Sequence, residues 1–318
     1  MKAIVCSKYG PPEVLQFKEM KKPMPKKNEL LIKIHATAVT GSDLIVRGFK
    51  LPNWSLLGIL MRIAIGFRKP RNPILGMIIS GEIESTGKNV NRFKSGDSIF
   101  GWTLKSGGTI KMGTYAEYIC VHENSIITIK PDTINYEEAA AIPYGGLIGL
   151  YFLKKAQVEN CKNVLIYGAS GAIGSSAVQI AKSYGTKVTG VCSTRNLEMV
   201  KSIGADTVID YTKEDISDIK DSFDLIVDSV PFGKINRKEL KLKCINILSP
   251  KAKYISIDDG SPQAFQDDLE FLKKLIEKGK LKAVIDKTYP LEKIVEAHKH
   301  AETGHKRGNI IIVNQNIL

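Results

Sequence analysis

The pattern of apolar and polar positions along the chain separates two parts with different rhythms. In the first part, short segments of alternating apolar and polar residues are punctuated by Gly and Pro. Such segments are typical of β-strands that turn back after a few residues. They predict strands over residues 2–6, 30–36, 80–86, 98–100, 115–121 and 126–129, and with them a compact β-rich barrel.

From residue 163 onward, strand patterns alternate with helix patterns. The pattern predicts strands over residues 163–167, 187–192, 207–210, 224–228, 253–257 and 283–285, and helices over 173–184, 195–203, 236–248 and 266–278. Repeated strand and helix units predict an α/β domain with a doubly wound parallel sheet.

The last part of the chain returns to the first domain in this interpretation. An amphipathic helix over residues 291–302 precedes a strand pattern over 309–313 that no helix follows, so this strand is free to pair with the first part. We therefore expect a β-rich domain from residues 1–125 and 286–318, and a parallel-sheet domain from residues 126–285.

Length and composition agree with this division into two domains, and they also indicate in which cellular compartment the protein is expected. A chain of 318 residues is longer than most single cores grow, which favours two domains. Its start lacks a secretory signal, and its five cysteines are spread out without a C-x-x-C pair. We expect reduced thiols and a cytoplasmic protein.

The formal net charge of +13 indicates a surface that attracts anions. Nucleic acid is one such partner. However, the lysines are spread through nearly every segment and no RNA-binding signature accompanies them, which favours an ordinary solvated basic surface. A cofactor rich in phosphate would also be attracted by this charge.

The strongest chemical motif follows the strand predicted at 163–167. Gly168 opens the sequence Ala169-Ser170-Gly171-Ala172-Ile173-Gly174, which leads into an apolar helix pattern. Small residues let the backbone approach a pyrophosphate, and the helix start offers unpaired N–H groups. The order strand, motif, helix predicts a dinucleotide site that uses residues 169–173. A tight turn without a ligand is the simpler alternative.

The end of the next strand indicates which dinucleotide is bound. NAD-binding sites place a carboxylate there to hold the ribose hydroxyls, whereas this chain has Ser193, Thr194 and Arg195. Hydroxyls and a guanidinium can donate to a 2′-phosphate. The sequence therefore predicts NADPH as the cofactor, unless Arg195 is only a solvated residue at a helix start.

Several stretches resemble the zinc-independent quinone oxidoreductase branch of the medium-chain dehydrogenase/reductase family. They span most of the chain and comprise residues 90–101 (VNRFKSGDSIFG), 115–118 (YAEY), 138–143 (EAAAIP), 164–182 (VLIYGASGAIGSSAVQIAK), 203–206 (IGAD), 208–211 (VIDY) and 304–308 (GHKRG). The resemblance implies a GroES-like β-barrel catalytic domain built from both chain ends, a Rossmann domain, and a cofactor between them.

The resemblance also bears on zinc. Zinc-dependent relatives place a ligand Cys where this chain has Thr40, in the segment Thr40-Gly41-Ser42-Asp43, and a ligand His where it has Met77. Zinc prefers thiolate and imidazole ligands, and neither position supplies one. We therefore expect no metal site.

Without a metal, the resemblance implies hydride transfer from NADPH to a small apolar quinone or α,β-unsaturated carbonyl compound. It places Thr40 and Asp43 at the nicotinamide end of the cofactor and Tyr211 near the 2′-phosphate. Asp43 has an alternative structural role, in which it orients a loop or caps a helical turn. The functional alternatives are a zinc-independent alcohol or carbonyl reductase, and a non-catalytic protein that binds NADPH and RNA.

Two further features concern partners. Relatives usually have an apolar strand between residues 257 and 268 that pairs with its twin in a dimer. This chain lacks such a pattern, so we do not expect a strand-paired dimer. The apolar segment 54–67 is too short to span a bilayer. It is an active-site lid or a packed helix, with an interfacial anchor as the weaker option; nucleic acid and membrane are not expected partners.

Overall fold

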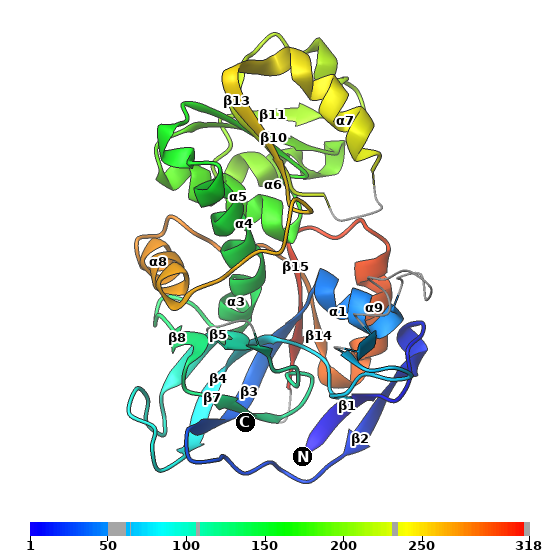
Figure 1. The fold of residues 1–318 in the computed structure, drawn as a ribbon, viewed down its shortest axis with the longest axis vertical. Helices are drawn as coiled ribbons and strands as arrows, with labels where there is room; N and C mark the ends of the chain where they lie inside the picture. Colours follow the sequence, from blue (N-terminus) through cyan, green and yellow to red (C-terminus); the bar gives the residue numbers. More distant parts are fainter. Residues whose placement is uncertain (50–61, 64, 106–108, 231–234, 315–318) are drawn as a thin grey trace. The chain divides into compact units, whose positions relative to one another are not determined.

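The computed structural model describes residues 1–49, 62–63, 65–105, 109–230 and 235–314 (Figure 1). The chain divides into two compact units: Met1–Pro143 with Ile285–Leu318, and Tyr144–Val284. The first unit thus combines both chain ends. Its first boundary differs from the expected one at residue 125, because residues 126–143 pack on the strands of the first unit.

Two sheets form the first unit. Strands β1 (Lys2–Cys6) and β2 (Leu15–Glu19) pair antiparallel. In the larger sheet, β3 pairs with three neighbours, among them β15, which comes from the other chain end and lies beside it (Figure 1). This sheet contains β3 (Glu29–Val39), β4 (Ile78–Thr86), β5 (Ser98–Lys105), β6 (Thr109–Ile110), β7 (Tyr118–His122), β8 (Ser125–Ile129), β14 (Ile285–Pro290) and β15 (Asn309–Val313).

Alternation along these strands builds the core of the first unit. Successive side chains of a strand point to opposite faces, so every second residue of β3 reaches the same interior. These inward-facing residues of β3 pack against apolar residues of β4, β5, β7 and β8. The buried cluster consists of Leu30, Ile32, Ile34, Ile79, Ile83, Ile99, Ile119, Val121 and Ile127. Burial of these mainly branched side chains stabilises the barrel-like arrangement.

Helices cover the rest of the first unit. They are α1 (Gly41–Gly48), α3 (Tyr136–Ala141) and α9 (Ile294–Glu302). Helix α3 contacts β3, β4, β5 and β15, which is why residues beyond 125 belong to this unit. Helix α9 packs on α1 and β15. It buries Ile294, Ala297 and Ala301 in a second apolar cluster of this unit, which also contains Ile4, Leu15, Leu75, Ile310 and Ile312.

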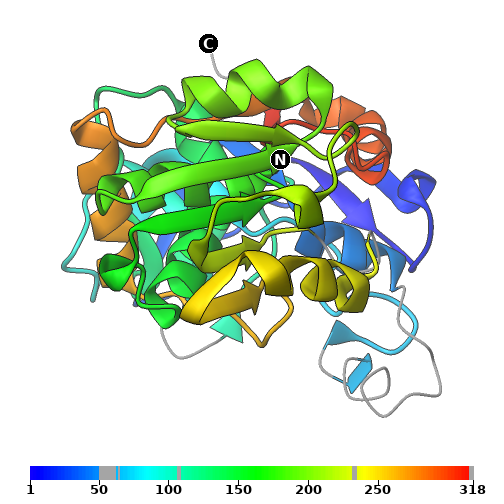
Figure 2. The same cartoon turned by 90° about the horizontal axis from the view of Figure 1, so that it is seen from above.

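The second unit is built on a parallel sheet of order β11-β10-β9-β12-β13, whose strands run side by side from green to yellow in Figure 2. The strands are β9 (Asn163–Tyr167), β10 (Lys187–Cys192), β11 (Thr207–Asp210), β12 (Phe223–Asp228) and β13 (Leu248–Ser256). Its helices are α4 (Pro143–Lys155), α5 (Ala172–Ser183), α6 (Leu197–Ser202), α7 (Arg237–Cys244) and α8 (Gln266–Glu277). The predicted doubly wound sheet is confirmed.

Each face of this sheet has its own packing. Leu165 and Val191 belong to the cluster that contains Leu240 and Cys244 of α7. The opposite face is covered by α5 and α6, which contact β9, β10 and β11. Gly190 faces α6 so closely that an added Cβ would lie 2.5 Å from a methyl carbon of Val200. Helices therefore exclude water from both faces, as a parallel sheet requires.

Two element predictions are wrong at the end of this unit. Residues 283–285 do not form a sixth parallel strand, because β14 begins at Ile285 and pairs with β15 in the first unit. The helix predicted to reach residue 248 ends at Cys244, since Leu248 already belongs to β13. The apolar pattern of residues 283–285 predicts a strand, but the pattern alone does not determine which of the two sheets the strand pairs with.

The absence of an added strand after β13 is confirmed for residues 257–265, all of which the structure describes. In the described sheet, β13 is therefore an edge strand. It carries Pro250, which has no N–H to donate, and Lys251 in a left-handed backbone conformation (φ 68°). Proline and lysine are residues that discourage pairing at a sheet edge.

No helix in the described part of the chain combines the length and apolarity needed to cross a bilayer. The segment 54–67 discussed above lies mostly outside the described residues. Of this segment, only residues 62, 63 and 65–67 are described.

A buried ion pair joins the two chain ends inside the first unit. Arg47 of α1 has a side chain only 1% exposed, and its Nη2 lies 2.5 Å from Oε1 of Glu302 at the end of α9. Neither Nε nor Nη1 of Arg47 has a hydrogen-bond partner among the described residues. The guanidinium thus depends on Glu302 for a negative charge, because an unpaired buried charge is costly.

We predict that Glu302→Gln lowers the free energy of unfolding by about 3 kcal/mol, because it leaves Arg47 buried without its counter-charge. The matched control is Glu13→Gln, which breaks the exposed pair of Glu13 with Lys299 on the same helix. It should cause no measurable change. Urea denaturation compares the two variants, and an equal, small loss in both would show that Arg47 does not need Glu302.

Candidate functional site

The glycine-rich loop lies where the strand order of the parallel sheet reverses. From β9 the chain moves outward to β10 and β11 and then returns to β12 on the other side of β9. Residues 168–171 follow the carboxyl end of β9 and lead directly into α5. In open parallel sheets this switch point is where ligands bind.

Glycine is required at two positions of this loop and its helix, and at one position of α4 that contacts them. Gly168 has φ 78°, a left-handed conformation that other residues adopt at a cost. A Cβ at Gly174 would lie 2.2 Å from the carbonyl oxygen of Gly168 and 2.7 Å from Oγ of Ser229. A Cβ at Gly145 of α4 would lie 2.1 Å from the carbonyl oxygen of Ala172. Helix α5 is thus held in direct backbone contact with both its strand and α4.

The start of α5 is left open to an anion. Its N-cap residue, Gly171, has no side chain to cap the helix, so the N–H groups of the first turn need an external acceptor. Together with the helix dipole, these groups form a site for a phosphate. Ala169 and Ala172 are buried, whereas Ser170, Gly171 and Ile173 are partly exposed. All five predicted loop residues therefore lie at one helix start.

The residues predicted to hold a 2′-phosphate follow β10, which lies next to β9, and β11, which lies next to β10. Ser193 is partly exposed, and Thr194 and Arg195 are exposed in the turn before α6. Tyr211 is 53% exposed just after β11, and its ring lies 6.3 Å from the ring of Tyr167 at the end of β9. The carboxyl ends of three adjacent strands thus bring these groups to one edge of the sheet.

Two polar residues that the sequence prediction missed organise this edge. Asn196 is buried and its side-chain amide donates to Oγ of Ser170 at 3.2 Å and to Oγ of Ser193 at 3.1 Å. It therefore links the glycine-rich loop to the end of β10. The sequence signal would have been an Asn at the start of the helix predicted over 195–203, but no role was assigned to this residue from the sequence.

The second missed residue is Asp210, a buried carboxylate at the end of β11. It accepts hydrogen bonds from Oγ1 of Thr194 at 2.5 Å and from Oγ1 and N of Thr212 at 2.7 and 3.0 Å. The hydrogen bond from Thr194 is the main reason that the pKa of Asp210 is lowered. The hydroxyl proton of Thr194 is thus committed to Asp210, so that Ser193, Arg195 and Tyr211 are the candidate donors to a phosphate.

An arginine joins the ends of β12 and β13 on the other side of the switch point. Arg237 of α7 contacts the buried carboxylate of Asp228, donates to Oγ of Ser256 at 2.5 Å, and pairs with Asp258 at 2.7 Å. It also donates to the carbonyl oxygen of Val230. Burial outweighs the nearby guanidinium and raises the pKa of Asp228. Arg237 thus holds the end of β12 next to the end of β13, which is the last strand of the described sheet.

In the first unit, the predicted catalytic pair Thr40 and Asp43 forms a helix cap. Both N and Oγ1 of Thr40 donate to Oδ2 of Asp43, at 2.9 and 2.7 Å, and Oγ1 of Thr40 accepts from N of Asp43 at 3.3 Å. Gly76 N donates to Oδ1 of Asp43 at 3.2 Å. The capping role left open by the sequence is therefore observed, while a catalytic role stays a prediction.

Burial governs the chemistry of this cap. Asp43 is 0% exposed, and desolvation raises the pKa of its carboxyl to about 6 in spite of the bonds from Thr40. Tyr115 is also fully buried, and its pKa is raised well above the ordinary value by burial and by the charge of Asp43. The ring of His298 meets Tyr115 edge-on at 5.6 Å. Burial and the charge of Arg47 lower the pKa of His298 to about 3, so this imidazole is neutral.

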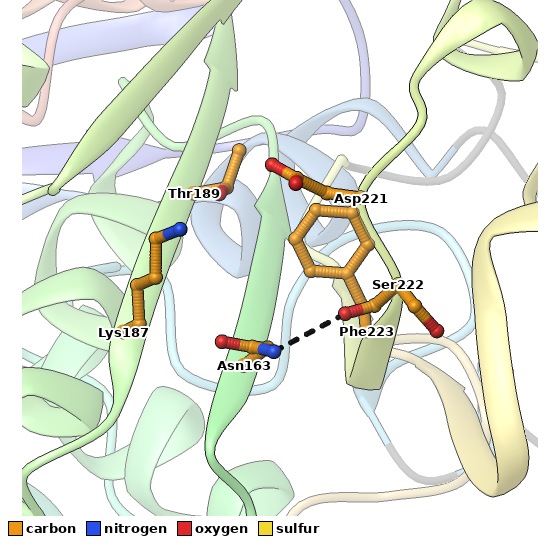
Figure 3. A pocket seen from close by; sticks show the side chains of 6 residues that line it. All are labelled: Asn163, Lys187, Thr189, Asp221, Ser222 and Phe223. Atoms are coloured by element: carbon orange, nitrogen blue, oxygen red, sulfur yellow. Dashed lines mark hydrogen bonds between the residues drawn. The ribbon is translucent and has the colours of Figure 1, made fainter.

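A small cavity in the second unit does not coincide with the glycine-rich loop (Figure 3). Its volume is about 40 Å³, and it lies at the amino-terminal ends of the parallel strands, between Asn163, Lys187 and Phe223. Asn163 Nδ2 donates to the carbonyl oxygen of Ser222 at its rim, at 3.4 Å. A space of this size accommodates one or two water molecules and excludes a nucleotide.

Family models match both units of the chain. The model described as alcohol dehydrogenase GroES-like domain matches residues 26–131. Two models described as zinc-binding dehydrogenase match residues 172–257 and 260–312.

Individual relatives extend over nearly the whole chain. The 2-methylene-furan-3-one reductase of Solanum lycopersicum is 31% identical over 98% of this chain and 79% of its own length. The chloroplastic quinone-oxidoreductase homolog of Spinacia oleracea is 31% identical over 98% of each chain. The solved quinone oxidoreductase from Coxiella burnetii is 28% identical, with a TM-score of 0.78 over 98% of this chain and 99% of its own.

The chain belongs to the quinone oxidoreductase-like branch of the medium-chain dehydrogenase/reductase family. Membership confirms the fold, a GroES-like unit with a Rossmann unit, and places the chain among oxidoreductases. Since one of these relatives is a chloroplastic protein, the cytoplasmic location stays a prediction.

Two of the matching family models are described as zinc-binding dehydrogenase. In this chain, however, Thr40 and Met77 stand where zinc-dependent relatives place zinc ligands, and neither side chain suits a zinc ion. The hydroxyl of Thr40 is committed to Asp43, and Met77 presents a thioether that is 1% exposed. Zinc sites use thiolate, imidazole or carboxylate ligands. Within the residues that the structure describes, no three His, Cys, Asp or Glu side chains are grouped so that they could hold a metal.

The glycine contacts of this family's loop give a direct test. We predict that Gly174→Ala lowers the free energy of unfolding by about 2 kcal/mol, because its Cβ collides with the backbone of Gly168 and α5 must shift. Gly171→Ala is the matched control, since the nearest atom to its Cβ is 3.5 Å away and its φ is −79°. Urea unfolding measures the free energy of unfolding of both variants. Equal values would contradict the close contact of α5 with the loop.

Proposed function

We propose that the protein is an NADPH-dependent reductase that transfers hydride to a quinone or an α,β-unsaturated carbonyl compound without zinc. The observation that carries the cofactor assignment is the edge formed by β10 and β11. There Ser193 is partly exposed and Thr194, Arg195 and Tyr211 are exposed, while the carboxylate of Asp210 is buried and accepts bonds from Thr194 and Thr212. Donors exposed beside a carboxylate that is itself buried favour a 2′-phosphate over free ribose hydroxyls.

The residues of the Rossmann unit fit a dinucleotide. Gly168 and Gly174 allow the backbone to turn tightly, and the uncapped start of α5 offers N–H groups to the pyrophosphate. Asn196 fixes Ser170 and Ser193 relative to each other, so that the pyrophosphate and ribose ends of the site are positioned together. A guanidinium such as that of Arg195 can hold a phosphate with two parallel hydrogen bonds.

When bound, NADPH would supply the hydride. The protein then has to bind and orient the cofactor and the substrate, and to exclude water from them. In our proposal Thr40 and Asp43 contribute by positioning. Both hydrogen-bond donors of Thr40 point to Asp43, and the buried Asp43 holds Gly76 as well. These bonds fix the start of α1 next to the segment of Gly76. The negative charge that develops on the substrate oxygen then requires other donors or water.

The relatives support the substrate class. One is named a 2-methylene-furan-3-one reductase, another an NADPH-dependent alkenal/one oxidoreductase from Arabidopsis thaliana, which is 29% identical over 98% of this chain. Others are named quinone oxidoreductases. The common feature of quinones and enones is an electron-poor carbon conjugated to a carbonyl group.

We expect the purified protein to oxidise NADPH with quinones or short enones and to retain this activity after treatment with a zinc chelator. NADPH absorbance follows the reaction. Arg195→Ala should raise the KM for NADPH roughly tenfold and leave the KM for NADH nearly unchanged, because only NADPH carries the 2′-phosphate. Lys201→Ala, an exposed cation on the neighbouring α6, is the control and should change neither constant.

Two results would contradict this function. One is alcohol oxidation with NADP that disappears on chelation, which would indicate a zinc-dependent dehydrogenase. The other is tight, salt-sensitive RNA binding without any turnover, which would indicate a binding protein.

A further inference from the structure

The first unit exposes an apolar and basic loop that the proposed reaction does not use. We define it as residues 62, 63 and 65–71; it is pale blue in Figure 2. The sequence around it is one-sided in charge. Residues 44–81 contain no Asp or Glu, but six basic residues: Arg47, Lys50, Arg62, Arg68, Lys69 and Arg71.

The base of this loop is held by hydrogen bonds. Gly66 N donates to the carbonyl oxygen of Arg62 at 2.9 Å, and Arg71 N donates to that of Ile65 at 2.7 Å. The hydroxyl of Tyr9 donates to the carbonyl oxygen of Gly66 at 2.7 Å. Gly66 has φ 125°, and a Cβ there would lie 2.0 Å from the carbonyl oxygen of Lys69. The turn is therefore tight and needs glycine.

Arg62 stabilises the loop from inside. Its guanidinium lies 4.2 Å from the ring centre of Phe49 and 5.9 Å from that of Tyr9, and it donates to the carbonyl oxygen of Phe67. Ile65 packs against the apolar cluster of the first unit, and Pro70 is buried. Ile65, Gly66 and Pro70 thus attach the described part of the loop to the first unit.

The outer side of the loop combines apolar and cationic groups. Phe67 is 68% exposed and Ile63 is 57% exposed, although both side chains are large and apolar. Arg68, Lys69 and Arg71 are also exposed, and none of them has an acidic partner in the described part of the chain. Two large apolar side chains exposed beside three cations form a candidate interaction surface.

We propose that this loop binds the surface of an anionic lipid bilayer. Phe67 and Ile63 enter the boundary between headgroups and acyl chains, and Arg68, Lys69 and Arg71 contact lipid phosphates. An aromatic and an aliphatic side chain beside several cations are the combination that interfacial binding requires. The loop complements an anionic surface fully, because its segment carries no acidic residue that would be repelled.

The same features argue against nucleic acid as the partner. Phosphate contacts would use the three cations, but exposed Ile63 has no π-face on which a base could stack. The proposal changes the expectation from sequence, which gave the membrane as an improbable partner because segment 54–67 is too short to span a bilayer. Binding at the surface requires no spanning segment.

Sedimentation with vesicles tests the proposal. The full-length protein is mixed with vesicles of phosphatidylcholine alone, or of phosphatidylcholine with phosphatidylglycerol, at low and at physiological salt. We expect binding to the anionic vesicles only, weakened by salt. Phe67→Ser should reduce binding roughly tenfold, because it removes the largest inserted side chain. Phe17→Ser, at another exposed phenylalanine of the same unit, should not.

A charge-matched pair of variants separates the loop from the general basic surface. Arg68→Glu with Lys69→Glu should abolish binding, whereas Lys27→Glu with Lys88→Glu, at exposed lysines elsewhere in the first unit, should reduce it far less. Both pairs change the net charge equally, and thermal unfolding checks that each variant is folded. Equal loss in both pairs, unchanged binding of Phe67→Ser, no binding of the wild type, or binding of single-stranded RNA in preference to vesicles would each overturn the proposal.

Discussion

The contact between α5 and the turn that precedes it is the constraint on which the second unit depends. A Cβ at Gly174 would lie only 2.2 Å from the carbonyl oxygen of Gly168, so the helix can approach its strand only with glycine at that position. This approach places the uncapped start of α5 at the carboxyl end of β9. It is there that the strand order reverses and that β10 and β11 bring Ser193, Arg195 and Tyr211 to the same edge. The proposed cofactor site thus follows from backbone geometry.

The first unit depends on groups that the two ends of the chain bring together. Strand β15 pairs with β3, and Glu302 of α9 neutralises the buried Arg47 of α1. On the same helix α1, the cap formed by Thr40 and Asp43 also binds Gly76. The polar residues of this region therefore hold secondary structure in place, while a catalytic role of Thr40 and Asp43 stays a prediction. The basic loop around Phe67 extends from this unit and joins the proposed reductase to a surface where apolar quinones would dissolve.

Much of this arrangement could be predicted from local patterns. Strands β9, β10, β11 and β15 have the predicted bounds, because apolar runs bordered by turn residues specify them locally. The glycine-rich loop was recognised because its function fixes residue types in consecutive positions. The missing strand after β13 was equally visible, since a strand leaves an apolar pattern and residues 257–265 have none.

What was missed depends on contacts between distant segments. Asp210 lies in the stretch 208–211 that carries part of the resemblance, but that stretch does not show that its carboxylate holds Thr194 of the neighbouring strand end. Arg237 joins Asp228 to Ser256, and these three residues lie in none of the stretches that carry the resemblance. The expected boundary after residue 125 falls inside β8, although the strand pattern at 126–129 was counted with the barrel; the pairing of β8 with β5 assigns this strand to the first unit. Likewise, the run at 283–285 belongs to a strand of the first unit, and only the partner β15 decides this.

The proposed function requires that the edge at Ser193, Arg195 and Tyr211 selects the 2′-phosphate. The most direct measurement is a calorimetric titration of the wild-type protein with NADPH and with NADH in the same buffer. We expect NADPH to bind roughly tenfold tighter or more, since a phosphate held by charged and polar donors adds affinity on this scale. Equal affinities, or tighter binding of NADH, would contradict it.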